Sequence, residues 1–129
     1  MKFSDNLISW YHQHKRDLPW RNTTDAYKIW VSEVILQQTR VEQGQAYYER
    51  IIAKYPDIFS LANAREEDLL KLWQGLGYYT RARNMLKAAK EIVSNYGGEF
   101  PPFYDKMIKI RGIGKYTAAA VLSFAYNMP

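Results

Sequence analysis

Residues 107–120 read MIKIRGIGKYTAAA, and this stretch decides how the chain folds. An apolar segment leads into two glycines around one isoleucine, and a segment rich in small residues follows. Glycine permits a positive φ and lets another backbone approach closely. Gly112 and Gly114 therefore predict a tight hairpin between two helices. The alanines that follow allow the second helix to pack closely against a neighbour.

The same hairpin offers a site for an anion. Where a tight turn leads straight into a helix, backbone N–H groups point outward and a phosphate can accept them. This pattern is typical of a helix-hairpin-helix element, which holds the DNA backbone without reading bases. The alternative is an ordinary turn between helices that ends on a glycine cap. Flanking cations favour DNA, and we expect backbone contacts from Lys109, Arg111, Gly112, Gly114, Lys115 and Thr117.

Helical spacing of apolar residues continues outward from this hairpin, and no alternation typical of a strand persists. Helices are expected at about 3–15, from a cap at residues 23–25 to 38, and at 41–55, 57–63, 65–75, 79–96, 103–109 and 115–126. The acidic run at 65–68 suits the positive end of a helix dipole. The sequence predicts an all-α fold with short connections.

Composition excludes several classes of protein. The chain has 129 residues, 47% of them hydrophobic and 24% charged, which is ordinary for one globular domain. It has no cysteine, so these residues form no disulfide, thiolate zinc site or cysteine-bound iron–sulfur cluster. Two histidines are too few for a His-rich metal site, and no metal site is expected. No apolar run approaches the roughly 20 residues of a membrane span, and we expect a cytoplasmic protein.

The positive charge is concentrated in the second part of the chain. The net charge is +5, and all of this excess lies within residues 77–129. A segregated basic surface indicates a polyanionic partner. A merely solubilising face is the equally simple alternative, so charge alone does not decide.

Glu33 stands out on the expected second helix. It is the only charged residue between Lys28 and Arg40, and helical counting places it beside Ile29, Trp30 and other apolar residues. A carboxylate in an apolar setting is desolvated, which favours its protonated form and suits it to donate a proton. A buried glutamate paired with an arginine, or capping a neighbouring helix, is the structural alternative.

Four motifs in order together resemble a known family. They are LPWR at 18–21, WVSEVILQQTRV at 30–41, LWQGLGYYTRARN at 72–84, and the glycine hairpin followed by YTA at 116–118. The set closely resembles the A/G-specific adenine DNA glycosylases of the helix-hairpin-helix glycosylase superfamily. That resemblance implies a helical glycosylase domain of the six-helix-barrel type over 17–129, truncated, with the hairpin element at about 103–126.

The resemblance also implies an activity. Such enzymes act in base-excision repair: they flip out an adenine mispaired with 8-oxoguanine or guanine in double-stranded DNA and hydrolyse its N-glycosidic bond. Glu33 matches the catalytic glutamate, which protonates adenine and helps to activate water. The adenine pocket is implied for Arg16, Leu18, Trp20 and Arg21. Recognition of the lesion or intercalation is implied for Gln38, Thr39, Leu76 and Tyr78, whereas Tyr79 is expected in the core.

Tyr116 distinguishes branches of this superfamily. The endonuclease III branch has a lysine there, which attacks the sugar as a Schiff-base nucleophile. Lys115 lies one residue earlier, about 100° away around a helix, and cannot replace it. The resemblance therefore implies a monofunctional hydrolytic glycosylase with Tyr116 as a catalytic residue beside Glu33. Arg111 departs from the proline usual before the hairpin, and we expect this change to be tolerated.

Further parts of the family's pattern are expected outside this sequence. They are a second catalytic aspartate, four cysteines for a [4Fe–4S] cluster and a C-terminal domain that helps to recognise 8-oxoguanine. Residues 1–16 are expected to form a helix that packs on the cluster domain, and the full-length protein is expected to be monomeric. Two alternatives stay open: a non-catalytic DNA-binding module, and an endonuclease III-like enzyme for oxidised pyrimidines.

Overall fold

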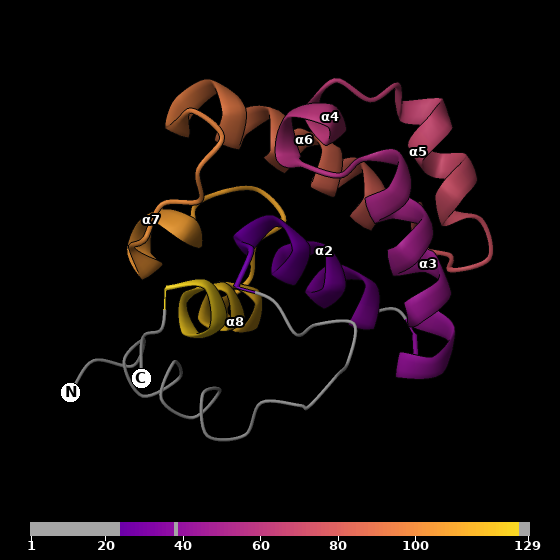
Figure 1. The fold of residues 1–129 in the computed structure, drawn as a ribbon. Helices are drawn as coiled ribbons and strands as arrows, with labels where there is room; N and C mark the ends of the chain where they lie inside the picture. Colours follow the sequence, from indigo (N-terminus) through magenta and orange to yellow (C-terminus); the bar gives the residue numbers. More distant parts are fainter. Residues whose placement is uncertain (1–23, 38, 127–129) are drawn as a thin grey trace.

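The computed structural model describes residues 24–37 and 39–126, and these form helices joined by short turns (Figure 1). The helices are α2 (Ala26–Leu36), α3 (Val41–Lys54), α4 (Ile58–Ala62), α5 (Glu66–Trp73), α6 (Tyr79–Tyr96), α7 (Tyr104–Met107) and α8 (Lys115–Ala125). Within the described ranges there is no strand, which confirms the all-α prediction. The helix expected at 3–15 lies outside the described residues.

Helix α2 lies at the centre of the fold. It packs against α8 on one side and α3 on the other, while α6 packs against α4 and α5 (Figure 1). The side chains of Ile29, Val31 and Ile35 are fully buried, and Trp30 is almost fully so. Because such large apolar side chains are removed from water around most of its circumference, α2 is the element on which the core is built.

Small residues let α8 approach α2 closely. Ala118, Ala119 and Ala120 are fully buried, followed by Val121 and Leu122. Alanine adds little width to a helix, so two helices packed through alanines leave little space between their backbones. The small-residue stretch after the hairpin therefore packs into the core, as the sequence predicts.

Three helices end two residues earlier than the sequence predicts. Helix α2 ends at Leu36 with Gln37 as its C-cap, α5 ends at Trp73, and α7 spans only Tyr104–Met107. After α7 the chain turns at once into the hairpin, with Ile110 N–H donating to the Met107 carbonyl at 3.1 Å. This bond spans three residues rather than four, so the turn tightens and the helix ends.

Candidate nucleic-acid interface

Two isoleucine side chains of the hairpin between α7 and α8 pack into the core. Ile110 and Ile113 are both buried. The Ile113 N–H donates to the Ile110 carbonyl at 3.1 Å, which closes the turn. Burial of these two side chains sets the direction of the loop, so the residues between and after them face outward: Arg111, Gly112 and Gly114 are exposed.

The two glycines have different roles. Gly112 has a φ of +83°, and a Cβ added there would lie 3.2 Å from the Cβ of Asn84 on α6. A residue with a side chain would be strained at this φ and would also crowd Asn84, so only glycine fits here without strain. Gly114 has an extended φ of −84° and open space around its missing side chain. The sequence pattern suggests equivalent roles for the two glycines, but the turn itself requires only Gly112.

Gly114 instead determines how α8 begins. It is the N-cap of α8 and has no side chain that could cap the first N–H groups of this helix. The first backbone donors of a helix need partners from outside the helix. A glycine N-cap provides no side-chain acceptor for these donors, so a phosphate oxygen is a suitable acceptor there, and the helix dipole favours the negative charge.

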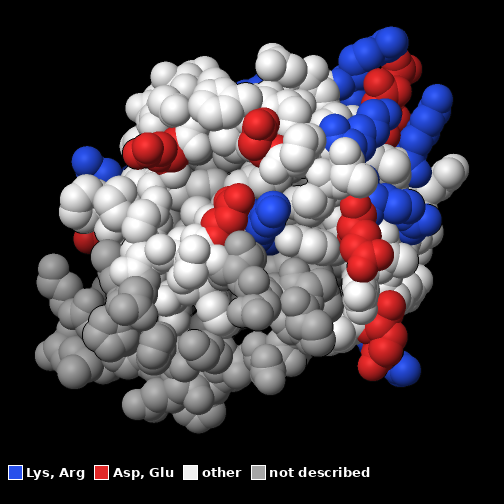
Figure 2. All heavy atoms as spheres, in the orientation of Figure 1, with Lys and Arg blue, Asp and Glu red and all other residues white. Residues whose placement is uncertain are grey.

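The cations around the hairpin are exposed. Lys109, Arg111 and Lys115 all lie on the surface, and no ion pair of Lys109 or Arg111 is formed within residues 24–37 and 39–126. Elsewhere charges neutralise one another: Arg83 pairs with Glu66 at 3.7 Å, and Arg65 pairs with Glu67. Figure 2 shows this mixture on the side of α3 and α5, where blue and red side chains alternate.

Thr117 is placed differently from the other hairpin residues. Its side chain is buried, and its Oγ1 accepts a hydrogen bond from Gln37 Nε2 at 3.0 Å. The hydroxyl therefore faces the end of α2 rather than the surface. This hydroxyl is therefore not on the surface where the sequence predicts a contact with the DNA backbone.

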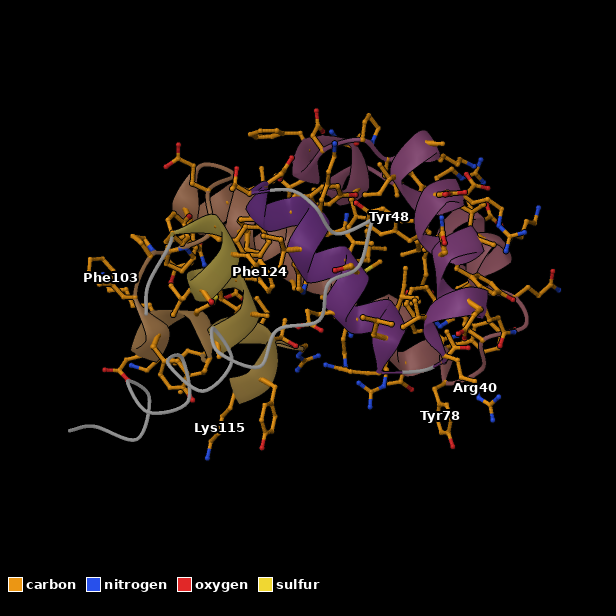
Figure 3. All side chains as sticks on the ribbon, turned by 60° about the horizontal axis from the view of Figure 1, so that its bottom comes forward. Arg40, Tyr48, Tyr78, Phe103, Lys115 and Phe124 are labelled. Atoms are coloured by element: carbon orange, nitrogen blue, oxygen red, sulfur yellow. The ribbon has the colours of Figure 1, made fainter. Side chains whose placement is uncertain are left out.

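Two tyrosines project from this face. Tyr78 is 78% exposed and has a φ of +51°, and Tyr116 in the first turn of α8 is 64% exposed. Figure 3 shows Tyr78 near Arg40, with Lys115 along the same edge of the molecule. Exposed aromatic side chains and cations on one face are suited to stacking on bases and to contacting phosphates. Tyr79, expected in the core, is 37% exposed.

The other predicted site residues differ in burial and in their contacts, and some lie outside the described residues. Leu76 is buried next to the exposed Tyr78. Thr39 Oγ1 donates to Gln43 Oε1 at 2.7 Å, so its hydroxyl joins the first turn of α3. Glu33 is half-buried on α2, one turn before Gln37. Arg16, Leu18, Trp20, Arg21 and Gln38 lie outside the described residues.

Sequence reasoning missed Gln37 and Arg81. The Gln37 side chain contacts Thr117 of α8 and also accepts a hydrogen bond from the Arg81 guanidinium of α6. Gln37 is 44 residues from Arg81 and 80 from Thr117. No local pattern indicates pairs so far apart. An exposed polar residue at a helix C-cap is the only sequence signal, and it is a weak one.

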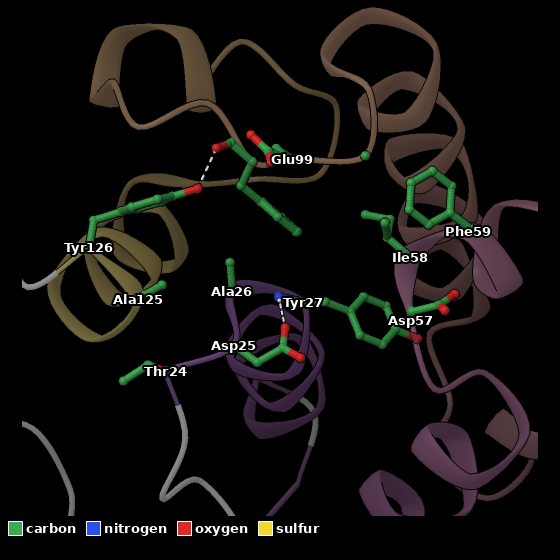
Figure 4. A pocket seen from close by; sticks show the side chains of 12 residues that line it. Thr24, Asp25, Ala26, Tyr27, Asp57, Ile58, Phe59, Glu99, Ala125 and Tyr126 are labelled. Carbon is green, nitrogen blue, oxygen red and sulfur yellow. Dashed lines mark hydrogen bonds between the residues drawn. The ribbon is translucent and has the colours of Figure 1, made fainter.

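A pocket of about 430 Å³ lies at the other end of α2 (Figure 4). Its described lining includes the carboxylates of Asp25, Asp57 and Glu99 and no lysine or arginine. The Tyr126 hydroxyl donates to the Phe100 carbonyl at 2.6 Å beside it. Burial raises the pKa of Tyr126, and the Glu99 carboxylate raises it further. This negative pocket is unsuited to a phosphate.

Tyr27 lines the same pocket and is buried. Its hydroxyl donates to the Tyr55 carbonyl at 2.6 Å. Burial raises the pKa of Tyr27 well above its usual value, and the nearby carboxylates of Asp57 and Asp25 raise it further. A low dielectric and neighbouring negative charges both disfavour a phenolate.

Neither a metal cluster nor a membrane helix is found in the described part of the chain. No group of three or more His, Cys, Asp or Glu side chains is arranged to hold a metal ion there. The same residues include no helix with the length and apolar character needed to cross a bilayer.

Comparison with known proteins identifies relatives of this chain. Residues 31–126 match the model of the HhH-GPD superfamily base excision DNA repair proteins. The chain is 44% identical to adenine DNA glycosylase of Buchnera aphidicola subsp. Baizongia pistaciae, over 98% of the chain and 36% of that protein. It is 43% identical to the Mus musculus adenine DNA glycosylase, over 97% of the chain and 26% of that protein. The chain thus spans about a third or less of these curated relatives.

Solved structures share the fold. A thermostable thymine-DNA glycosylase superposes with a TM-score of 0.80 at 27% identity, covering 97% of this chain and 58% of that one. An endonuclease III in a trapped covalent complex with DNA gives a TM-score of 0.77 at 24% identity, covering 98% and 58%. These likenesses agree with the helical architecture expected from the hairpin motif.

Proposed function

The chain belongs to the HhH-GPD superfamily of base excision DNA repair proteins, and we propose that it provides the helical part of an adenine DNA glycosylase. The substrate is double-stranded DNA in which adenine is mispaired with 8-oxoguanine or guanine. The reaction is hydrolysis of the N-glycosidic bond of that adenine. Such a protein acts in the cell compartment that contains the genomic DNA.

Sequence similarity is the observation that carries this proposal. Relatives from bacteria and mammals that bear the name adenine DNA glycosylase match 97% or more of the chain at 41–44% identity. The motif WVSEVILQQTRV at 30–41 falls on α2 and the start of α3, at the centre of the fold. Three exposed cations and two exposed tyrosines on one face support a DNA partner.

In this proposal Glu33 is the general acid. Protonation of adenine at N7 makes the base a better leaving group, and the resulting carboxylate then assists the attack of water on the sugar. Glu33 is held on a helix whose neighbouring side chains are buried in the core. A rigid support suits an acid that must meet one ring nitrogen of an extruded base.

Further residues complete the proposed site. Arg16, Leu18, Trp20 and Arg21 line the adenine pocket, and Gln38, Thr39, Leu76 and Tyr78 face the opposite base or enter the stack. The exposure of Tyr78 supports the second role, because a flipped base leaves a gap that an aromatic ring can fill.

Tyr116 supports a hydrolytic reaction without a covalent enzyme intermediate. It is exposed in the first turn of α8, and a phenol does not form a Schiff base with a sugar. Lys115 precedes it and lies about 100° away around the helix. The chain has no cysteine, so the [4Fe–4S] cluster expected for the full-length family has no ligands among these residues, and no step of this mechanism depends on it.

A chimera tests the proposal. The chain replaces the matching segment of the Buchnera aphidicola adenine DNA glycosylase, and single-turnover excision is measured on a duplex with one A:8-oxoguanine pair. We expect adenine release, and we expect Glu33→Gln to bind the duplex but to lose at least a hundredfold in rate, about 2.7 kcal/mol. Excision by Glu33→Gln within tenfold of the unsubstituted chimera contradicts the role of Glu33.

The non-catalytic alternative predicts a different result. A DNA-binding module supports binding by the chimera to any duplex but no release of adenine, with or without Glu33. An endonuclease III-like enzyme predicts release of oxidised pyrimidines instead. The same assay with a thymine glycol duplex separates these outcomes.

A further inference from the structure

Three helix ends meet at the side chain of Gln37. Gln37 is the C-cap of α2, and its backbone N–H donates to the Glu33 carbonyl at 3.2 Å. Its Nε2 donates to Thr117 Oγ1 at 3.0 Å in the first turn of α8. Its Oε1 accepts from the guanidinium of Arg81 in the first turn of α6. One residue therefore joins the end of α2 to the beginnings of α6 and α8.

Each of these contacts lies next to a residue of the proposed site. The Arg81 N–H donates to the Tyr78 carbonyl at 3.0 Å, so Arg81 belongs to the turn that begins at Tyr78. Thr117 directly follows Tyr116. The backbone of Gln37 closes the turn of α2 that carries Glu33. A shift of Gln37 would move all three turns relative to one another.

An amide satisfies both side-chain contacts with the hydrogen-bond directions that they have in the structure. A guanidinium is a donor without an acceptor, so the group opposite Arg81 must be an oxygen. The same side chain must present a donor to Thr117, whose hydroxyl oxygen accepts. Glutamate keeps the acceptor for Arg81 but keeps Thr117 only when the threonine hydroxyl turns to donate, and alanine supplies neither contact. Glutamine at this position provides both in one planar group.

We infer that Gln37 is a positioning residue that sets the separation of the first turns of α6 and α8, and with it the spacing of Tyr78 and Tyr116 across the DNA-facing surface. The spacing itself follows from the three contacts. Its consequence for DNA rests on the proposed function. Because Gln37 is exposed, its loss changes placement more than it changes stability: a typical hydrogen bond contributes only about 1 kcal/mol.

The lack of cysteine makes the spacing measurable. Thr80→Cys and Tyr116→Cys provide two unique attachment points for spin labels, both at exposed positions in the first turns of α6 and α8. Double electron–electron resonance then gives the distribution of distances between the labels. We expect a narrow distribution in the labelled parent chain and a broader, shifted distribution with Gln37→Ala. A distribution with Gln37→Ala that superposes on that of the labelled parent overturns the inference.

Matched variants exclude a general effect of removing a glutamine. Gln45→Ala removes an exposed amide on α3 that donates to Glu49 at 3.1 Å, and should leave the distribution unchanged. Gln37→Glu keeps the acceptor for Arg81, and Thr117→Val removes the partner on α8, so each should broaden the distribution less than Gln37→Ala. Because Gln37 and Thr117 act as a pair, Gln37→Ala combined with Thr117→Val should be no broader than Gln37→Ala alone. Additive broadening contradicts the pair.

Binding of the unlabelled chain to a duplex with an A:8-oxoguanine pair tests the consequence. We expect Gln37→Ala to weaken binding at least threefold while Gln45→Ala leaves it unchanged. A broadened distance distribution with unchanged affinity overturns the positioning role toward DNA. Failure of the unsubstituted chain to bind any duplex overturns the proposed function instead, and the distance distributions then still decide whether Gln37 sets the spacing.

Discussion

The two ends of α2 meet helix N-termini of opposite kinds. Near its beginning, Asp25 caps α2 through the N–H groups of Tyr27 and Lys28, and Asp57 forms a capping box with Ser60 on α4. Near its end, α6 and α8 begin at Tyr78 and Gly114 with no side-chain cap. The capped end lies beside the negative pocket of Figure 4, and the uncapped end beside exposed tyrosines and cations.

This difference shows how one set of helices forms a stable end and a binding end. An aspartate cap satisfies the first donors of a helix and stabilises the fold by about 1 kcal/mol. A glycine N-cap leaves those donors for a ligand and gives up that stability. In the proposed function, the carboxylates near the start of α2 lie where no anion binds, and the glycine N-cap of α8 lies where the DNA backbone binds.

The largest expected effect is on binding at the uncapped end. Changing Lys109, Arg111 and Lys115 together to alanine should weaken binding on the order of a hundredfold at 0.1 M salt. The slope of affinity against salt should fall by about one for each phosphate that the protein no longer neutralises. Fluorescence anisotropy across a salt series checks both. A loss of affinity confined to mispaired DNA contradicts backbone binding and indicates reading of bases.

At the capped end, Tyr27→Phe should reduce stability and leave binding unchanged. It removes the donor to the buried Tyr55 carbonyl, and a buried group left without a partner costs about 1–3 kcal/mol. Urea unfolding measures this loss. A weaker affinity for DNA together with an unchanged midpoint of unfolding contradicts the separation of the two ends.

The stability of the chain at alkaline pH provides a second test of the role of Tyr27. Its pKa is raised in the folded state, so its contribution to stability is complete below the unfolded pKa of about 10 and is lost as the pH rises above it. In that range one such group steepens the loss by up to about 1.36 kcal/mol per pH unit. The parent should therefore lose stability more steeply above pH 10 than Tyr27→Phe. Equal slopes contradict the assignment.

A smaller loss is expected for Asp25→Ala. The cap accepts from Tyr27 N–H at 2.9 Å and from Lys28 N–H at 3.4 Å, and its removal should destabilise the chain by about 1 kcal/mol. Asp25→Asn keeps an acceptor oxygen and should recover most of this loss. Thermal unfolding followed by circular dichroism compares the two. Equal losses indicate that the charge of Asp25, rather than its cap, is what stabilises α2.

The sequence predicts the architecture well because its signals are local. Helical spacing and the hairpin glycines identify the helices and their order, and the shift of positive charge toward residues 77–129 indicates the basic hairpin. The small residues after Gly114 correctly predict close packing of α8.

What the sequence does not predict depends on contacts between distant residues. The inward direction of Thr117 follows from Gln37, which lies 80 residues away. The different demands on Gly112 and Gly114 appear only when α6 is in place, because the space at Gly112 is limited by Asn84. Tyr79 looks like a core residue by composition, but its exposure depends on how the α5–α6 turn is oriented.

Adding an aspartate cap to α8 is the most direct test of a binding role for the uncapped start of this helix. Gly114 has an extended backbone and open space, so Gly114→Asp can cap α8 without strain. Thr24→Asp, at an exposed position beside the negative pocket, adds the same charge at the other end as a control. Affinity for duplex DNA and urea stability are measured on both variants.

We expect Gly114→Asp to gain about 0.5 kcal/mol of stability from the cap and the helix dipole. The same variant should lose about tenfold in affinity, roughly 1.4 kcal/mol, because its carboxylate occupies the donors meant for a phosphate. Thr24→Asp should leave affinity unchanged. Unchanged affinity in Gly114→Asp, or an equal loss in both variants, contradicts the claim that the uncapped start of α8 holds the DNA backbone.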